Sequence, residues 1–452
     1  MITTLPATAP GADKAIEPAR RPVGHRTPRR AARRVLLHTP AKLRGLLALL
    51  VLLSLAWGAF GGWVAIQHSS AANSLVSVNE RLTLDSRQMY QALADADATI
   101  TAAFLASDKP PLSQLQRYRA DLATAEGDLS GLQAAGGSPT IRTALARLVA
   151  GLPAYNGDIG EATAEYAMGF PLTGGSFLQV ASDEAHLVLL PAASTVFTRQ
   201  NAALKAASGQ ATELPLVIAA VALALVTAFV LFRAQRWLSR RTNRVLSPGL
   251  VLASLLLAVS VIWLVAAFFT ARSDLERGIS QGDVGAYDLA FASIGVQQIR
   301  GDAVLNLISR DDGLSFQDNF EATSKKTGPG PGSWLTEAAA AQPAVGPGAS
   351  LVATAERDAT AWYAVNSEGY RLDTADNFPA ERTLVTGTAA AGYTALASDL
   401  TKGIQADQDV FDSAASSGAS TLDPLEGVVI AASLLMAAGC AWAVSRRLAE
   451  YR

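Results

Sequence analysis

Several residue types and motifs on which enzymes rely are scarce or missing in this sequence of 452 residues. There is one cysteine, Cys440, which excludes an intrachain disulfide and a cysteine-ligated metal centre. The chain has no Walker loop, no glycine-rich dinucleotide motif after a strand, no HExxH and no GxSxG. These absences predict a protein that is not an enzyme and that holds no cofactor and no metal. The four histidines are scattered and form no ligand pair: His25, His38, His68 and His186.

Charged and aromatic side chains are also scarce. Only 17% of the residues are charged and 7% are aromatic, whereas half are apolar. Many alanines and few aromatic residues favour helix over sheet. The apolar residues are concentrated in four blocks, and the sequence between them has the spacing of amphipathic helices. The sequence therefore predicts an all-α membrane protein.

The four apolar blocks are long enough to cross a bilayer. A spanning helix needs about 20 apolar residues because the hydrocarbon core is roughly 30 Å thick. We therefore predict four transmembrane helices, in which Glu426, near one end, is the single charged residue. A cleaved signal peptide is the alternative for the first block, but its apolar stretch and its basic leader are too long for one. The blocks comprise residues 45–67, 214–232, 250–270 and 425–444.

Basic residues indicate which side of the membrane each connection occupies. Lys and Arg are in excess in residues 1–44, 233–249 and 445–452, whereas the long connections 68–213 and 271–424 are acidic. The positive-inside rule therefore predicts a multi-pass protein of the cell membrane with both termini in the cytoplasm. The first 44 residues have no apolar periodicity and are expected to be disordered. The cytoplasmic loop is expected to contact lipid headgroups or a partner through its arginines: Arg233, Arg236, Arg240, Arg241 and Arg244.

The order of the segments repeats. Each half consists of a span, an exterior connection of about 150 residues and a second span. In each half a long helix leaves the membrane and ends in an apolar pair, Phe104-Leu105 or Leu307-Ile308. This repetition predicts a tandem duplication with two extracytoplasmic helical bundles side by side.

Proline and glycine divide the two exterior connections into helices. The first connection is predicted to be an up-and-down four-helix bundle, with Ser138 as the N-cap and Pro139 as the first residue of its third helix. The second is predicted to be a less regular helical domain. Breaks are expected at residues 109–111, 136–139, 174–175, 328–332 and 343–348.

Three charged residues are candidates for contact with a ligand or partner. Asp97 falls between Leu93 and Ile100 in an apolar stripe of helical spacing, where a carboxylate is costly unless it is paired. Arg300 and Asp302 occupy the related stretch of the second half. The commoner interpretation of all three is a satisfied polar contact within a bundle.

Glycine and tryptophan in the spans suggest how the spans pack. Gly58 and Gly62 form a GxxxG motif, which permits close approach of another helix. The tryptophans of the spans are expected to be interfacial or lipid-facing anchors: Trp57, Trp63, Trp263 and Trp442.

Four stretches of the chain resemble a known family. The run Asp95-Ala-Asp97-Ala-Thr-Ile-Thr-Ala-Ala-Phe-Leu resembles the first exterior helix of the GlnX-type membrane proteins. Residues 152–155 (LPAY) and 190–193 (LPAA) are similar to the first domain of that family, and residues 298–308 (QIRGDAVLNLI) to its second. The four-span plan is similar from about residue 42 to residue 446.

The resemblance implies a role in amino-acid sensing. In that family an extracytoplasmic solute-binding lipoprotein detects acidic amino acids or their amides. The four-span protein relays this signal to a cytoplasmic Ser/Thr kinase of the protein kinase G type. The resemblance thus implies a non-enzymatic signal transducer with the bilayer, the lipoprotein and the kinase as partners.

Two other functions remain open on the residues alone. A transporter or permease subunit is the first, although a pathway through the spans would be expected to contain ionisable residues. A scaffold protein of the cell envelope is the second. Nucleic acid is not an expected partner, because the exterior is acidic and the basic tail has no interleaved aromatic residues. A homo-oligomer is compatible with the sequence.

Overall fold

The computed structural model describes residues 29–106, 110–242, 248–309, 314–343 and 347–449. Helices account for nearly all of these residues, and no strand occurs among them. Four helices in this part of the chain are long and apolar enough to cross a membrane. The predicted all-α membrane fold with four spanning helices is therefore confirmed. Of the tail that was expected to be disordered, residues 29–44 instead belong to the helix that begins at Arg29, whereas residues 1–28 lie outside the described residues, as does Arg244.

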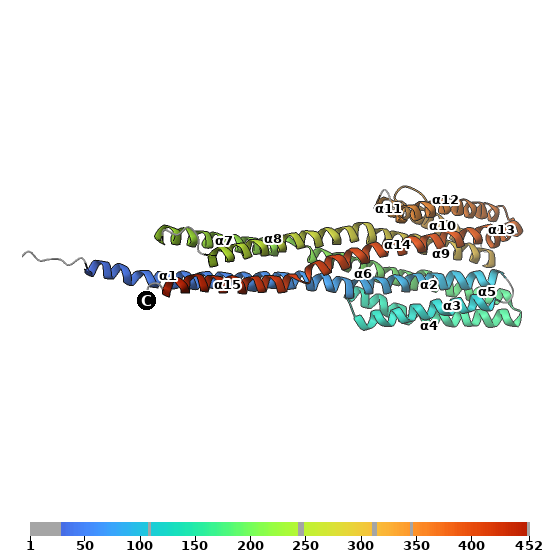
Figure 1. The fold of residues 1–452 in the computed structure, drawn as a ribbon. Coiled ribbons are helices and arrows are strands. Elements are labelled where there is room, and N and C mark those ends of the chain that lie inside the picture. Colours follow the sequence, from blue (N-terminus) through green and yellow to red (C-terminus); the bar gives the residue numbers. More distant parts are fainter. Residues whose placement is uncertain (1–28, 107–109, 243–247, 310–313, 344–346, 450–452) are drawn as a thin grey trace, which may run out of the picture.

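Four long rods run along the molecule, and the start of α1 and the end of α15 lie far from its broad end (Figure 1). The candidate spans lie in continuous helical segments of 61 to 70 residues, and the second of these segments, Pro171–Arg240, also includes the two shorter elements that precede Leu190. At a rise of 1.5 Å per residue each is about 90–105 Å long, of which a bilayer needs about 30 Å. The rods are α1 (Arg29–Ser74), η1 (Leu75–Glu80) and α2 (Arg81–Ala106); α6 (Leu190–Ala211) and α7 (Leu214–Thr242); α8 (Pro248–Arg277), η3 (Gly278–Asp283) and α9 (Val284–Ser309); and α13 (Phe378–Leu384), η4 (Val385–Ala389), α14 (Ala390–Leu422) and α15 (Leu425–Ala449).

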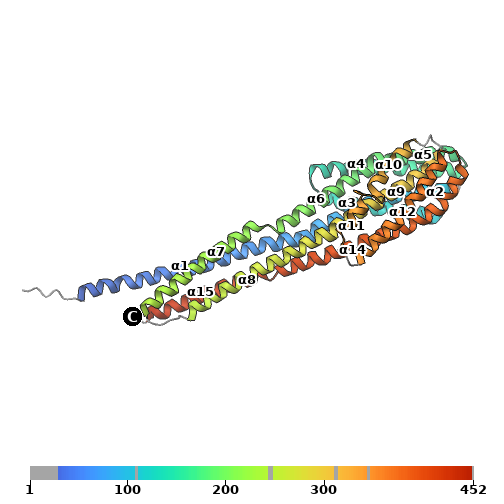
Figure 2. The same ribbon diagram turned by 90° about the horizontal axis from the view of Figure 1, so that it is seen from above.

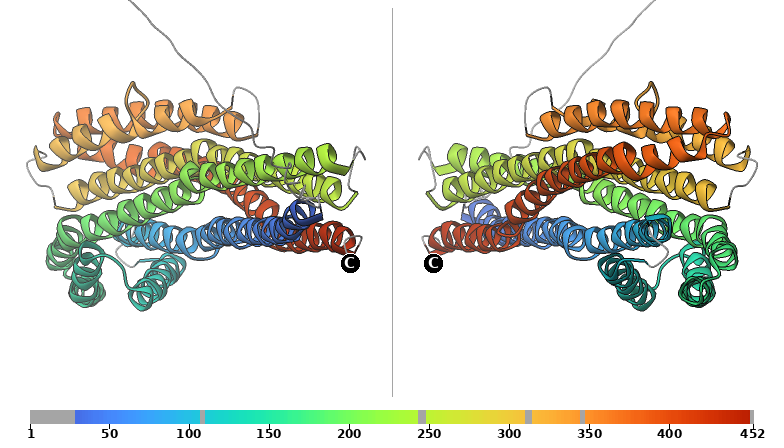
Figure 3. Two further views of the ribbon diagram at one scale, coloured as in Figure 1. Left: turned by 90° about the vertical axis from the view of Figure 1, so that its left-hand side faces the viewer. Right: turned by 90° about the vertical axis from the view of Figure 1, so that its right-hand side faces the viewer.

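The broad end, which we call the head, contains the shorter helices (Figure 2). We call residues 75–211 the first head segment and residues 278–422 the second, and the four apolar spans the stem. The helices α3, α4 and α5 of the first head segment lie on one side of the rods. The helices α10 to α12 of the second head segment lie on the opposite side (Figure 3). The remaining elements are α3 (Leu112–Ala135), α4 (Pro139–Met168), α5 (Pro171–Glu184), η2 (Ala185–Leu189), α10 (Leu314–Thr327), α11 (Trp334–Ala341) and α12 (Pro347–Asp373).

In the first head segment, the sequence predicted one helix start correctly and one helix break incorrectly. Ser138 caps α4, because its hydroxyl accepts a hydrogen bond from the Ile141 amide at 3.4 Å, and Pro139 is the first helical residue. The predicted break at Gly174-Gly175 is wrong, because both glycines lie within α5. The chain instead turns at Gly169, whose φ of 87° favours glycine. A Cβ at Gly174 would run into the Tyr166 ring, so this glycine serves close packing of α5 on α4.

The stem is a packed bundle whose polar contacts are few. Trp57 is fully buried and its indole nitrogen donates to the Ser260 hydroxyl at 3.2 Å, so the prediction of a lipid-facing anchor is wrong for this residue. Trp63, Trp263 and Trp442 are exposed, as the prediction requires. The indole of Trp57 turns inward because the apolar interior offers it a hydrogen-bond acceptor.

Glycines of α1 bring α15 close. A Cβ on Gly58 would run into the side chain of Ser433, and one on Gly62 would lie 3.2 Å from Ile430. The GxxxG motif therefore lies at the α1–α15 contact, as the sequence predicted. We expect Gly58→Val to destabilise the protein by about 2 kcal/mol through overpacking. Thermal unfolding checks this, with Gly45→Val in the same helix as the control, because an added Cβ there meets nothing within 4 Å. Equal melting temperatures for the two variants would contradict the close contact of α1 with α15 at Gly58.

The two head segments share one hydrophobic core. One cluster of buried side chains contains Met89 and Ile100 of α2 together with Leu289 and Ile299 of α9. Rings also meet across the boundary, since Tyr90 and Phe291 lie 5.9 Å apart between centroids. The head therefore moves as one packed unit in which a shift of α2 is felt by α9.

Candidate functional site

The candidate site begins where two rods widen into π-helices. η1 joins α1 to α2 and ends at Glu80, and η3 joins α8 to α9 and ends at Asp283. π-helical turns are rare and occur frequently at functional sites. Each of these two π-helices places an acidic side chain about 20 Å past the end of the apolar span that precedes it. Both side chains lie between the two head segments. We call Glu80, Arg87, Asn201, Asp283 and Asp412 the junction cluster.

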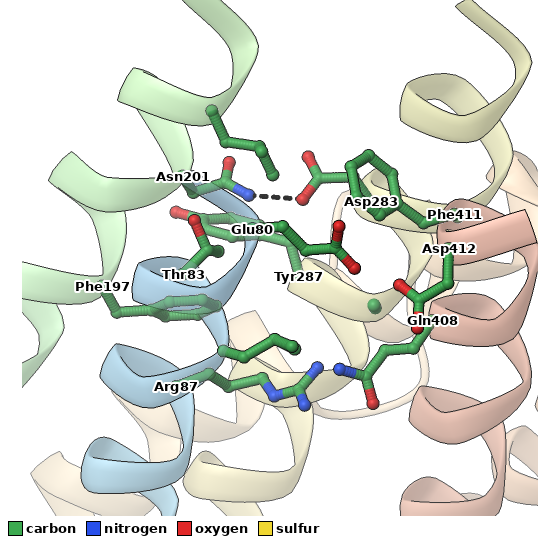
Figure 4. Close-up of a pocket in the computed structure, with 14 residues that line it drawn as sticks. Glu80, Thr83, Arg87, Phe197, Asn201, Asp283, Tyr287, Gln408, Phe411 and Asp412 are labelled. Atoms are coloured by element: carbon green, nitrogen blue, oxygen red, sulfur yellow. Dashed lines mark hydrogen bonds between the residues drawn. The ribbon is translucent and has the colours of Figure 1, made fainter. Parts of the chain in front are cut away.

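The junction cluster surrounds a small cavity of about 40 Å³ (Figure 4). Phe197, Tyr287 and Phe411 contribute aromatic walls. Gly282 lets the backbone of α14 approach η3, because a Cβ there would lie 2.7 Å from the Asp407 carbonyl oxygen. Asp412 is solvent-exposed, so the cavity has its polar opening on the α14 side.

Asp283 is held by α6. The Asn201 side-chain amide donates to one carboxylate oxygen of Asp283 at 2.8 Å, and the Lys205 ammonium lies 3.6 Å from the other. This contact ties the rod of α6 and α7 to the rod of α8 and α9. Burial raises the pKa of Asp283, while Lys205 and Asn201 oppose that shift by stabilising the carboxylate.

Glu80 and Asp412 form a carboxyl pair. Burial of Glu80, together with its hydrogen bond to Asp412 and the charge of Asp412, raises the pKa of Glu80 to about 8. Glu80 therefore holds a proton at pH 7, because two adjacent carboxylates are not both charged in a poorly hydrated site. A cation or an ammonium group entering the cavity would favour release of this proton.

Arg87 is the unusual residue of the cluster. It is 7% exposed, its Nε has no hydrogen-bond partner, and within the described residues it has no carboxylate oxygen within 4.0 Å. Burial lowers the pKa of Arg87 to about 10 in spite of the charges of Asp283 and Asp412, so it remains a cation at pH 7. A buried cation without a contacting counter-ion costs several kcal/mol, which favours a role in binding over a role in stability.

A second buried cluster lies farther along the head and contains two of the predicted site residues. The two ring nitrogens of His186, in η2, lie 3.3 Å from Asp97 and 3.4 Å from Asp302. The Ser182 hydroxyl donates to Asp97 at 3.1 Å. We call Asp97, His186 and Asp302 the histidine bridge, because it links η2 and α2 of the first head segment to α9 of the second.

The electrostatics of the histidine bridge favour a charged imidazole. Burial acts to lower the pKa of His186, but the contact with Asp97 and the charge of Asp302 outweigh it and raise the pKa to about 9. Burial raises the pKa of Asp302 to about 6, against the opposing charge of His186. At pH 7 the bridge is therefore a buried imidazolium between carboxylates.

The other predicted residues lie elsewhere. Arg300 does not join Asp302 in the bridge, and its guanidinium instead lies 4.1 Å from the centroid of the Tyr393 ring. Arg233, Arg236 and Arg240 are exposed near the end of α7. Arg241 lies in α7, but its side chain, like all of Arg244, is outside the part that the structure describes.

Sequence reasoning missed the junction cluster and His186. Glu80, Arg87 and Asp283 were inconspicuous because charged residues are ordinary in amphipathic helices. Their burial depends on packing between residues that lie about 80 or more positions apart in the sequence. The one available signal was that charged residues interrupt apolar faces in corresponding helices of the two halves.

The comparisons with known proteins concern the first head segment. Residues 71–209 match the family of the actinobacterial sensor domain. The matched region includes Glu80, Arg87, Asp97, His186 and Asn201, and so contributes to both clusters. No curated protein and no solved structure matches the chain. With its four apolar helices, the chain is therefore similar to sensor-type membrane proteins over this region.

Proposed function

We propose that this protein is a non-enzymatic transducer that relays an extracytoplasmic amino-acid signal, delivered by a solute-binding lipoprotein, to a cytoplasmic Ser/Thr kinase. The match to a sensor domain supports the sensing role. The basic excess at the stem end supports a head outside the cytoplasm and both termini inside. The resemblance to the GlnX-type proteins supports the choice of partners.

One observation carries the proposal. The cavity of the junction cluster is lined by α2, α6, α14 and the η3–α9 junction, and each of these is continuous in the chain with a different stem helix. A ligand that alters the spacing of these walls therefore acts on all four spans at once. Such a ligand shifts the equilibrium between two arrangements of the cavity walls only if it binds one arrangement more tightly than the other.

The chemistry of the junction cluster fits a small zwitterion. Arg87 offers guanidinium donors for a carboxylate, and Glu80 and Asp412 offer oxygens for an ammonium group. The aromatic walls limit the size of the part of the ligand that lies between its two charged groups. Acidic amino acids and their amides, transferred from the lipoprotein, have this pattern of charge.

The two halves correspond in a way that supports a tandem duplication. α2 and α9 have 26 residues each, and each follows a six-residue π-helix. η2 and η4 have five residues each and precede the helices that return to the stem. A duplicated head explains why each of the two six-residue π-helices ends in an acid of the junction cluster, Glu80 in η1 and Asp283 in η3.

The apolar stem favours a transducer over a permease. Residues 45–67, 214–232, 250–270 and 427–444 contain no charged side chain. The described spans pack through a core of residues such as Leu257 and Met436. A path for a polar solute would need ionisable or hydrated groups at this depth.

A test of the output side changes Arg233, Arg236 and Arg240 together to lysine. Lysine keeps the positive charge that sets topology but loses the planar guanidinium that binds acidic groups in a bidentate manner. We expect kinase-dependent phosphorylation in response to external glutamate to fall about tenfold, the effect of losing roughly 1.4 kcal/mol of docking energy. Arg446→Lys in α15 is the control. A full response in the triple variant would contradict the assignment of this loop.

Co-purification separates the proposal from its alternatives. Recovery of a kinase and a solute-binding lipoprotein with the full-length protein is the expected result. Recovery of an ATPase instead would favour a permease subunit, and recovery of wall-assembly proteins would favour an envelope scaffold.

A further inference from the structure

A second cavity lies between the far ends of the two head segments. It has a volume of about 220 Å³, several times that of the junction cavity. Its walls come from α2 and α3 of the first segment and from α9, α12, η4 and α14 of the second. The space exists because five wall residues have side chains that stop at Cβ: Ala102, Ala103, Ala303, Ala389 and Ala390. We call this cavity the distal pocket.

Arg300 is the one charged side chain among the described residues that line the distal pocket. Its guanidinium packs on the Tyr393 ring and has no carboxylate oxygen within 4.0 Å in the described part of the chain. The nearby carboxylate of Asp95 is already bound, because it accepts from Arg117 at 2.6 Å. Stacking on tyrosine fixes the plane of the guanidinium and leaves donors available for an anion.

Apart from Gln114, the rest of the wall is apolar or has its polar groups in hydrogen bonds. Leu105, Val304 and Val385 contribute aliphatic surface. The Trp362 indole nitrogen donates to the Ala389 carbonyl at 3.0 Å, and the Asn366 amide donates to the Trp362 carbonyl at 2.8 Å. These contacts leave the indole face as an apolar surface. Among the residues that the structure describes, no acidic side chain lines the distal pocket to receive an ammonium group, which distinguishes it from the junction cluster.

We propose that the distal pocket binds a small organic monocarboxylate with an apolar body. The carboxylate pairs with Arg300, and the body packs against Trp362 and the aliphatic wall. A neutral analogue lacks the ion pair, and an amino acid must bury its ammonium group without a counter-charge. Because the pocket is built from both head segments, occupancy stabilises their packing at the end farthest from the stem. The inference does not depend on the proposed relay.

Equilibrium dialysis with the full-length protein in nanodiscs tests the site. The probes are phenylacetate and hexanoate, with phenylacetamide and phenylalanine as the uncharged and zwitterionic comparisons. We expect the two carboxylates to bind at millimolar concentration or better and the comparisons to bind at least about tenfold more weakly, as the loss of a charge-assisted hydrogen bond predicts. Failure of both carboxylates to bind, or equal binding of phenylacetamide, would overturn the proposal.

Two variants locate the binding. Arg300→Gln is expected to weaken phenylacetate binding about 10- to 100-fold, whereas Arg147→Gln, on exposed surface of α4, leaves it unchanged. Ala102→Leu keeps the cation but fills the pocket from a half-buried position, so it is expected to block binding without disturbing the core. Binding that survives both Arg300→Gln and Ala102→Leu would place the ligand elsewhere and refute the site.

Discussion

Replacing Arg87 by methionine is expected to abolish the amino-acid response while leaving the folded protein at least as stable as the wild type. Arg87 is buried, and its Nε has no hydrogen-bond partner. Replacing a buried cation that has no contacting counter-ion by an apolar side chain of similar length removes its desolvation cost, so the change is expected to be neutral or stabilising. Losing one member of a buried charge pair with a ligand costs about 2–5 kcal/mol of binding, which is at least a 30-fold loss of affinity.

Two measurements on the Arg87→Met variant separate binding from structure. Thermal unfolding in nanodiscs reports stability, and kinase-dependent phosphorylation after addition of glutamate or glutamine reports the response. Arg119→Met, on exposed surface of α3, is the matched control and is expected to change neither quantity. A melting temperature well below that of the wild type would show that Arg87 holds the head together through Asp283 and Asp412. An unchanged response would remove it from the ligand site.

The second large effect is a loss of head stability at alkaline pH that depends on His186. The pKa of His186 is raised from 6.5 to about 9 in the folded protein. The folded state therefore binds the proton more tightly than the unfolded state. The stabilisation is fully present below pH 6.5 and is lost as the pH rises through about 9. Its size is roughly 1–3 kcal/mol, because ionising the buried Asp302 offsets part of the gain.

The readout for His186 is the difference in unfolding free energy between the wild type and His186→Gln as a function of pH. Taking the difference removes other groups that titrate in the same range, such as Glu80. We expect the wild type to be the more stable protein near pH 6 and to lose that advantage between pH 6.5 and about 9.5. His68→Gln, whose ring lies outside the bridge, is the control. A pH-independent difference would mean that the imidazole is not charged between Asp97 and Asp302.

The stem and the boundaries of most helices followed from one-dimensional patterns. Apolar length predicted the four spans, and Ser138 with Pro139 marked a helix start that the structure confirms. These features depend on each residue's own hydropathy or backbone preference. Gly174 misled the prediction because its role is to accommodate Tyr166, a contact between helices that no local pattern reveals. The prediction that Trp57 is a lipid-facing anchor failed for the same reason, since Ser260 on another helix determines where the indole points.

The candidate sites were predictable only in part. Asp97 could be singled out because a carboxylate within an apolar stripe must have a partner. Its partner, His186, lies 89 positions away on η2, and nothing in the spacing of the scattered histidines connects them. Arg300 and Asp302 are neighbours in the sequence, yet they point to different clusters. The junction cluster arises where π-helical turns shift the faces of α2 and α9, and the sequence contains no recognisable signal for such a turn.

The most direct test of the relay is a distance measurement across the end of the stem that we propose to be cytoplasmic. With Cys440 replaced by alanine, spin labels at Ser239 of α7 and Ser445 of α15 report the separation of two rods that belong to different halves. We predict that adding glutamate or glutamine together with the lipoprotein shifts the distance distribution in the otherwise unchanged protein and leaves it unchanged in Arg87→Met. An identical distribution with and without bound ligand in the otherwise unchanged protein would contradict the account.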